Sequence, residues 1–120
     1  IGRVPYGYLH QASPDDRAYR IGDQAAVIPS YSGDGMSIAL ASGKWAAQAI
    51  DAGFAPAQFN KALAGRLAAN VGYAYRFQPL IAQPGLLKPL MAAARLSGLA
   101  SPLGRWLFGQ TRTPIDRAPL

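Results

Sequence analysis

Two stretches of the chain repeat apolar residues at spacings of three and four, the period of an amphipathic α-helix. The first predicts a helix over residues 36–52, closed by Gly53, which tolerates the left-handed backbone of a helix C-terminus. The second predicts a helix that begins at Pro56 and stops before Pro79. The predicted core positions are Ile38, Ala41, Trp45, Ala49 and Ile50 in the first helix, and Phe59, Leu63, Leu67, Val71 and Ala74 in the second.

The remaining segments predict shorter elements. Helices are expected over residues 86–96 and 103–108, and the proline-punctuated tail 111–120 is expected to be irregular. Residues 3–10 and 17–21 are rich in aromatic and β-branched side chains and flank the turn cluster ASPDD, which predicts a short β-hairpin. Because two strands alone are marginally stable, the hairpin is expected to join a larger sheet. The predicted fold class is therefore α/β and helix-rich, with the hairpin followed by three to four helices.

Composition narrows the class of protein. Half of the 120 residues are hydrophobic and 15% are charged, a balance typical of a packed chain and not of a disordered one. The absence of cysteine excludes disulfides, thiolate metal sites and a cysteine nucleophile, and it suits the reducing cytoplasm. No apolar run reaches the roughly 18 residues that span a bilayer, and no signal peptide is recognisable. Because the chain begins with Ile1, we expect a fragment or a processed chain.

The net charge of +6 is concentrated in the second half of the chain. No acid lies between Asp51 and Asp116, whereas basic and aromatic side chains alternate there. The basic residues of this span are Lys61, Arg66, Arg76, Lys88, Arg95, Arg105 and Arg112. Such a half can bind an anionic membrane surface, an acidic partner or a nucleic acid, of which the nucleic acid is least expected. A solvated helix face without further function has the same composition.

The densest cluster of turn-forming residues precedes the first helix, in IGDQAAVIPSYSGDGMSIALASG, residues 21–43. Gly22 allows the backbone to approach a ligand closely, and the carboxylate of Asp23 can accept hydrogen bonds from sugar-like hydroxyls. Pro29 stiffens the crossing that follows. The Asp23 carboxylate can instead cap its own turn, as in any Gly-Asp corner, so the segment leaves a binding role and a structural role open.

The same segment ends at the start of the first helix, where backbone amides have no intrahelical acceptor. These amides belong to Gly35, Met36 and Ser37, and they can bind an anion or an electron-rich oxygen. Two structural interpretations stand beside this one. Asp34 can serve as the helix N-cap, and Met36 can be a core residue.

The segment resembles the second flavin-binding motif of the FAD-dependent oxidoreductases that include aromatic-ring monooxygenases and geranylgeranyl reductases. That motif runs Gly-Asp-Ala-Ala, a few apolar residues, a proline, Thr-Gly-Glu-Gly or a relative, and then an apolar helix. The residues at the matching spacing are Gly22, Asp23, Ala25, Pro29, Gly33, Asp34, Gly35, Met36 and Ala39. The Gly-Asp-Gly-Met form is nearer to the geranylgeranyl reductases, and the resemblance covers residues 19–50.

The resemblance implies that Asp23 binds hydroxyls of the FAD ribityl chain and that the amides of Met36 and Ser37 face the pyrimidine edge of the flavin. The full set of residues that it assigns to FAD is Gly22, Asp23, Pro29, Gly33, Gly35, Met36 and Ser37. The loop residues Ser30 and Tyr31 would lie beside the flavin ring and the pocket of a small apolar or aromatic substrate. These two residues and Gln24 depart from the family's usual pattern, which bears on the substrate class more than on flavin contact.

No G-x-G-x-x-G fingerprint, which would hold the ADP half of FAD, occurs in the sequence. We therefore expect a missing N-terminal dinucleotide-binding part and poor FAD binding by these 120 residues alone. The expected organisation is the end of an FAD-binding domain at residues 1–53, a helical C-terminal region at 54–110 and the tail at 111–120.

A second function class stays open, a basic interaction module in which the helices from Pro56 onward bind an anionic surface. Both can hold together if the flavoprotein touches the inner face of a membrane from the cytoplasm. Other chemistry finds little support. His10, the only histidine, is expected to be a hairpin residue, and Asp15 and Asp16 a solvated turn, so neither a metal site nor a hydrolytic triad is predicted.

Overall fold

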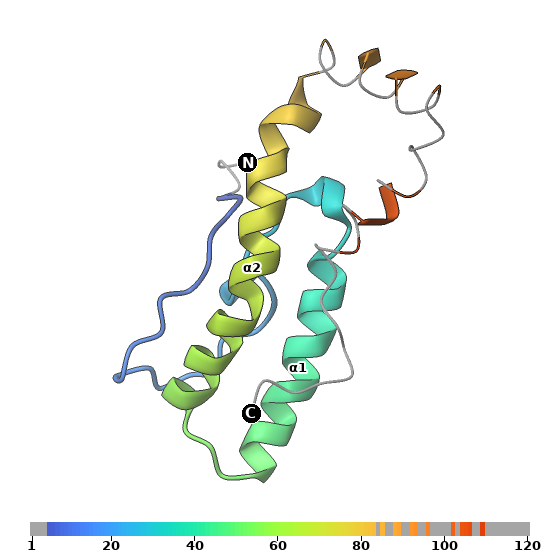
Figure 1. The fold of residues 1–120 in the computed structure, drawn as a ribbon. Helices are drawn as coiled ribbons and strands as arrows, with labels where there is room; N and C mark the ends of the chain where they lie inside the picture. Colours follow the sequence, from blue (N-terminus) through green and yellow to red (C-terminus); the bar gives the residue numbers. More distant parts are fainter. Residues whose placement is uncertain are drawn as a thin grey trace.

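The computed structural model describes residues 5–83 continuously and then residues 85, 88, 89, 92, 93, 96, 102, 104–106 and 109. Two helices dominate, α1 at Gly35–Asp51 and α2 at Pro56–Ala82. Two 3₁₀ turns precede them, η1 at Gly22–Gln24 and η2 at Ser30–Ser32. The two helices lie side by side and run in opposite directions, joined by a short loop (Figure 1). The described part of the chain is therefore mostly helical.

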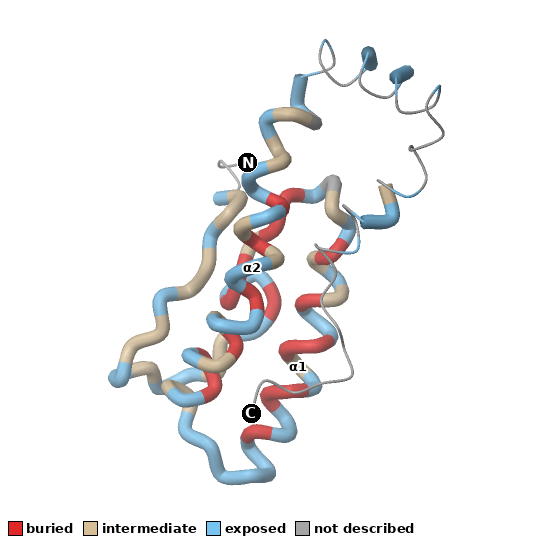
Figure 2. Tube along the Cα trace, viewed as in Figure 1, coloured by how far each residue is buried: buried red, intermediate tan, exposed pale blue. Residues whose placement is uncertain are grey.

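The core forms where the apolar faces of α1 and α2 meet (Figure 2). The predicted positions that are buried in it are Ile38, Ala41, Trp45, Ala49, Phe59, Leu63, Leu67, Val71 and Ala74. Residues before α1, Ala25, Ala26 and Ile28, complete the same cluster. The prediction for Ile50 is wrong, because its side chain is 56% exposed. One residue advances a helix by about 100°, which turns Ile50 away from the face that buries Ala49.

The ends of the two helices follow the predicted signals in part. Gly53 adopts the expected left-handed conformation after α1, with φ of 74°. Pro56 opens α2, and the Ala55 N–H donates a 2.9 Å hydrogen bond to Oε1 of Gln58. The predicted stop before Pro79 is wrong, because α2 continues to Ala82. A proline removes one backbone hydrogen bond, and this one does so in the last turn, where little helix remains to be disrupted.

The predicted hairpin between residues 3–10 and 17–21 is also wrong, since the described residues contain no strand. Leu9 instead forms an isolated antiparallel bridge with Ala26. Around it the His10 N–H donates to the Ala25 carbonyl at 2.8 Å, and further backbone bonds join Gly7 and Tyr8 to Val27. The first segment thus pairs with the chain that follows η1, so no larger α/β sheet is present in the described part.

A side chain of α2 takes the place of the missing strand partner for residues 17–21. The buried amide of Asn60 accepts a 2.9 Å hydrogen bond from the Arg20 N–H and donates one of 3.0 Å to the Ala18 carbonyl. Alternate residues of an extended segment present these groups on the same side, as they would to a neighbouring strand. The segment is therefore held against a helix.

The predicted helices over residues 86–96 and 103–108 and the tail 111–120 lie outside the continuously described residues. Within the part that is described, a search for a helix both long and apolar enough to cross a membrane finds none.

Candidate functional site

The Gly-Asp corner is fastened to the side of α1. Gly22 is buried with φ of 54°, a left-handed conformation that suits glycine. Its N–H donates a 2.9 Å hydrogen bond to Oγ of Ser42, which in turn donates to the Ala39 carbonyl at 3.2 Å. A Cβ atom at Gly22 would lie 3.5 Å from the Ala39 Cβ, so the corner rests directly on the helix. The position of η1 is thus set by contacts with the N-terminal half of α1.

Asp23 projects from this corner with an exposed side chain. The corner is closed by backbone hydrogen bonds: Gln24 N–H donates to the Ile21 carbonyl, and the N–H groups of Ala25 and Ala26 donate to that of Gly22. Within the described residues the Asp23 carboxylate has no hydrogen bond or ion pair. The structural alternative, in which Asp23 caps its own turn, is therefore not what the structure contains.

The crossing from η1 to α1 is made rigid by Pro29 and Ser32. Pro29 is fully buried, and its carbonyl accepts hydrogen bonds from both the backbone N–H and the Oγ of Ser32, at 3.1 and 2.8 Å. Gly33 then turns the chain with φ of 67°. Ser30 and Tyr31 belong to the 3₁₀ turn η2 on this crossing, and Ser30 is exposed.

The N-terminus of α1 presents free amides. The first intrahelical bond of α1 runs from the Ile38 N–H to the Asp34 carbonyl at 2.9 Å, which leaves the N–H groups of Gly35, Met36 and Ser37 without an acceptor among the described residues. Asp34 occupies the N-cap position and is buried, but its side chain makes no capping hydrogen bond. Met36 is 79% exposed, which excludes the alternative that it is a core residue of the described fold.

One residue beside this site, Tyr6, was not predicted from the sequence. The hydroxyl of Tyr6 lies 2.7 Å from Oγ of Ser30, so a phenol hydroxyl from the N-terminal segment also lies at the η2 turn. The antiparallel bridge between Leu9 and Ala26 sets this register, because counting back along one segment and forward along the other brings Tyr6 to the level of Pro29. The hydrophobic pattern carried no signal for this pairing, since the expected partner of residues 3–10 was a different segment.

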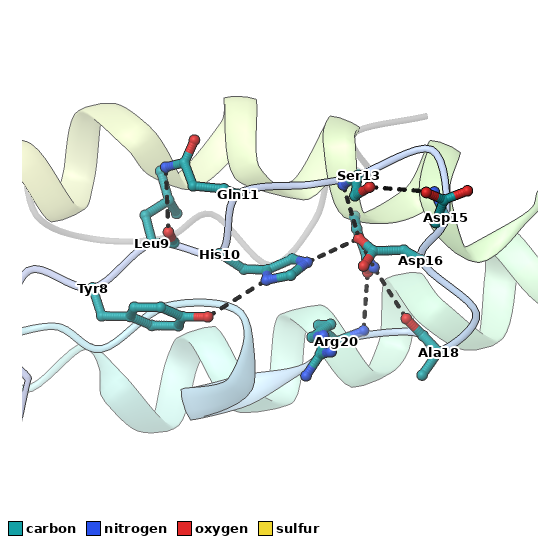
Figure 3. A network of polar contacts seen from close by, with 10 residues as sticks. Tyr8, Leu9, His10, Gln11, Ser13, Asp15, Asp16, Ala18 and Arg20 are labelled. Carbon is teal, nitrogen blue, oxygen red and sulfur yellow. Dashed lines mark hydrogen bonds and ion pairs between the residues drawn. The ribbon is translucent and has the colours of Figure 1, made fainter.

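A second polar cluster surrounds Asp16 and includes Asn60 of α2 (Figure 3). Oδ2 of Asp16 accepts hydrogen bonds from Nε2 of His10 at 2.8 Å, from Nδ2 of Asn60 at 2.9 Å and from the Ser13 N–H at 3.2 Å. The hydrogen bonds from His10 and Asn60 lower the pKa of Asp16 to about 2. The expectation that Asp16 is simply solvated is therefore wrong. His10, which is bonded to Asp16, helps to attach the N-terminal segment to Asn60 of α2.

No group of three or more potential metal ligands occurs among the residues that the structure describes. Comparison of the chain with models of protein families, with curated proteins and with solved structures finds no match. The chemistry that the site can perform is set by its own residues. Within the described part of the chain they offer a carboxylate without a partner on a corner fixed to α1, three amides without acceptors at the start of the same helix, and hydroxyls on the turn between them.

Proposed function

We propose that the chain supplies the ribityl- and ring-contacting part of an FAD-dependent oxidoreductase, either a reductase or a monooxygenase, acting on a small apolar or aromatic substrate. One observation carries the proposal. The Asp23 carboxylate, without a partner among the described residues, stands on a corner bonded through Gly22 to Ser42 of α1, and that helix begins with three amides that lack acceptors there. The Gly-Asp corner and the free amides are thus both attached to the N-terminal half of one helix.

These residues fit the chemical groups of FAD. A carboxylate accepts hydrogen bonds from vicinal hydroxyls, such as those of the ribityl chain, and Asp23 has this acceptor capacity to spare. The amides of Met36 and Ser37 would stabilise negative charge on the pyrimidine edge of the flavin, aided by the positive end of the α1 dipole. Bound FAD would supply the redox chemistry itself.

The remaining motif residues would shape the site. The crossing from η1 to α1 turns at Gly22 and Gly33, which both have a left-handed backbone, and it is held between them by the buried Pro29. Ser30 and Tyr31, on η2, would border the substrate side. The ADP half of FAD would require the separate N-terminal dinucleotide-binding part, and the absence of cysteine suits the cytoplasmic location that we propose.

The test is the replacement Asp23→Ala in the complete protein, with the flavin-to-protein ratio after gel filtration as the readout. Loss of hydrogen bonds to a charged acceptor costs about 1.5–3 kcal/mol, so we expect FAD affinity to fall by about tenfold to more than a hundredfold. Asp51→Ala is the matched control, because Asp51 is an exposed aspartate at the opposite end of α1.

The control variant is expected to retain flavin as the parent protein does. Equal flavin content in the Asp23→Ala variant and the parent would contradict the proposed role of Asp23. A complete protein that contains no flavin and binds none when FAD is added would refute the proposed function as a whole.

A further inference from the structure

The outer face of α2 carries only positive charge. Lys61, Arg66 and Arg76 are exposed, and the 27 residues of this helix include no acid. Among the described residues, none of these three cations takes part in an ion pair. At about 100° and 1.5 Å per residue, they lie within an arc of about 140° and extend along about 22 Å of the helix. Lys61 and Arg76 lie on the side of the helix away from the buried Leu63 and Leu67, and Arg66 lies at the edge of that side.

Aromatic and small residues accompany these cations. Tyr73 and Tyr75 are 41% and 54% exposed, and tyrosine prefers the boundary between water and lipid because its ring is apolar and its hydroxyl is polar. Exposed Gly65, Ala68 and Ala69 lie between the cations along the helix. Short side chains there allow a flat surface to approach the helix closely.

We propose that this cationic face, defined by Lys61, Arg66, Arg76 and Tyr73, docks on the surface of a membrane that contains anionic lipid. A planar array of headgroups can meet all three cations at once, because they lie within one half of the circumference of a single helix. The same acid-free part of the chain also exposes Leu96 and Trp106, by 91% and 56%. Exposed leucine and tryptophan beside basic residues are typical of binding at a lipid interface, and they favour lipid over nucleic acid as the partner.

The experiment measures binding of the complete protein to phosphatidylcholine vesicles with and without phosphatidylglycerol. We expect binding only to the anionic vesicles, and its loss in about 1 M salt, where the screening length falls to about 3 Å. In a K61Q/R66Q/R76Q variant, each lost cation removes about fivefold in affinity, or about a hundredfold in total. Lys44→Gln is the matched control, because Lys44 is an exposed cation on α1, and it is expected to change the affinity by at most a few fold.

Circular dichroism and thermal unfolding establish that the triple variant is folded, and an R66Q/R76Q variant, expected to lose about twenty-five-fold, serves if it is not. Equal binding to neutral and anionic vesicles would overturn the proposal, as would unchanged affinity in the folded variant. Tighter binding to a mixed-sequence RNA or DNA oligonucleotide than to the anionic vesicles would also overturn it, in favour of a nucleic-acid partner. None of these readouts depends on flavin.

Discussion

The backbone N–H of Gly22 donates a 2.9 Å hydrogen bond to Oγ of Ser42, and both residues are buried. The bond joins a corner of the loop to the middle of α1, across twenty positions of sequence. It gives Ser42 a role that its place on a buried helix face does not suggest, because an alanine would pack there equally well. Fixing the corner also fixes Asp23, the residue on which the proposed function depends.

We therefore predict that Ser42→Ala destabilises the fold and weakens flavin retention together. The variant leaves the buried Gly22 N–H without its acceptor, which costs about 1–3 kcal/mol of unfolding free energy. Urea unfolding and the flavin-to-protein ratio of the complete protein measure the two effects. Gln48→Ala, at an exposed position of α1, should change the unfolding free energy by less than about 0.5 kcal/mol. A Ser42→Ala variant as stable as the parent would show that the Gly22 bond contributes nothing.

Alanine at two glycines should have effects of opposite sign. Gly22 has φ of 54°, and a Cβ there would meet only ordinary van der Waals contacts. The cost of Gly22→Ala therefore comes from backbone strain, and the variant should lower the free energy of unfolding by about 1–2 kcal/mol. Gly65 lies exposed within α2 with no atom within 4 Å of a Cβ, so Gly65→Ala should stabilise by about 0.5–1 kcal/mol. Thermal unfolding of the two variants tests the pair, and stabilisation by Gly22→Ala would contradict the left-handed corner.

The helices could be predicted from the sequence because the signal is local. Apolar spacing and the signals at Gly53 and Pro56 depend on neighbouring residues, and the observed boundaries lie within one residue of those predicted at these ends. The absence of the expected hairpin could not be predicted, because the pairing of residues 17–21 depends on a residue far away in the chain. The side chain of Asn60 supplies the hydrogen bonds that a strand partner would have given to residues 17–21.

The candidate site likewise contains local features that the sequence predicted and long-range contacts that it did not. The predicted start of the first helix indicated the free amides of α1, and the Gly-Asp pair indicated the turn at Gly22, both properties of short segments. The bond from Gly22 to Ser42 and the contact of Tyr6 with Ser30 join segments that no periodic pattern relates. Such contacts follow from packing, which the order of apolar and polar residues specifies only indirectly.

A third prediction concerns the packing of the N-terminal segment against α2. Gly7 has φ of 84°, and a Cβ there would lie 2.6 Å from Cδ2 of Tyr75. Gly7→Ala should destabilise by about 2–3 kcal/mol through backbone strain and this collision together. In the double variant with Tyr75→Ala only the collision is relieved, so a coupling energy of about 1 kcal/mol is expected from the thermodynamic cycle. Strict additivity of the two changes would mean that the ring of Tyr75 does not cover Gly7.

The Asp16 cluster makes the free energy of unfolding depend on pH in the acid range. Hydrogen bonds from His10 and Asn60 lower the pKa of Asp16 from its ordinary 3.8 to about 2 in the folded protein. Because the fold favours the ionised carboxylate, the resulting stabilisation is fully present above pH 3.8 and is lost as the pH falls toward about 2. The free energy of unfolding of the parent should therefore decrease over this interval.

The replacement Asp16→Asn should abolish this contribution, since the amide does not ionise. Its unfolding free energy should fall less steeply between pH 4 and pH 2 than that of the parent, so that the difference between the two proteins narrows in acid. Asp15→Asn is the control at the adjacent, exposed aspartate, whose carboxylate is not joined to His10 or Asn60, and it should keep the steep profile of the parent. Parallel profiles for the parent and Asp16→Asn would show that the Asp16 carboxylate titrates alike in the folded and unfolded chains, and that the cluster does not hold it ionised.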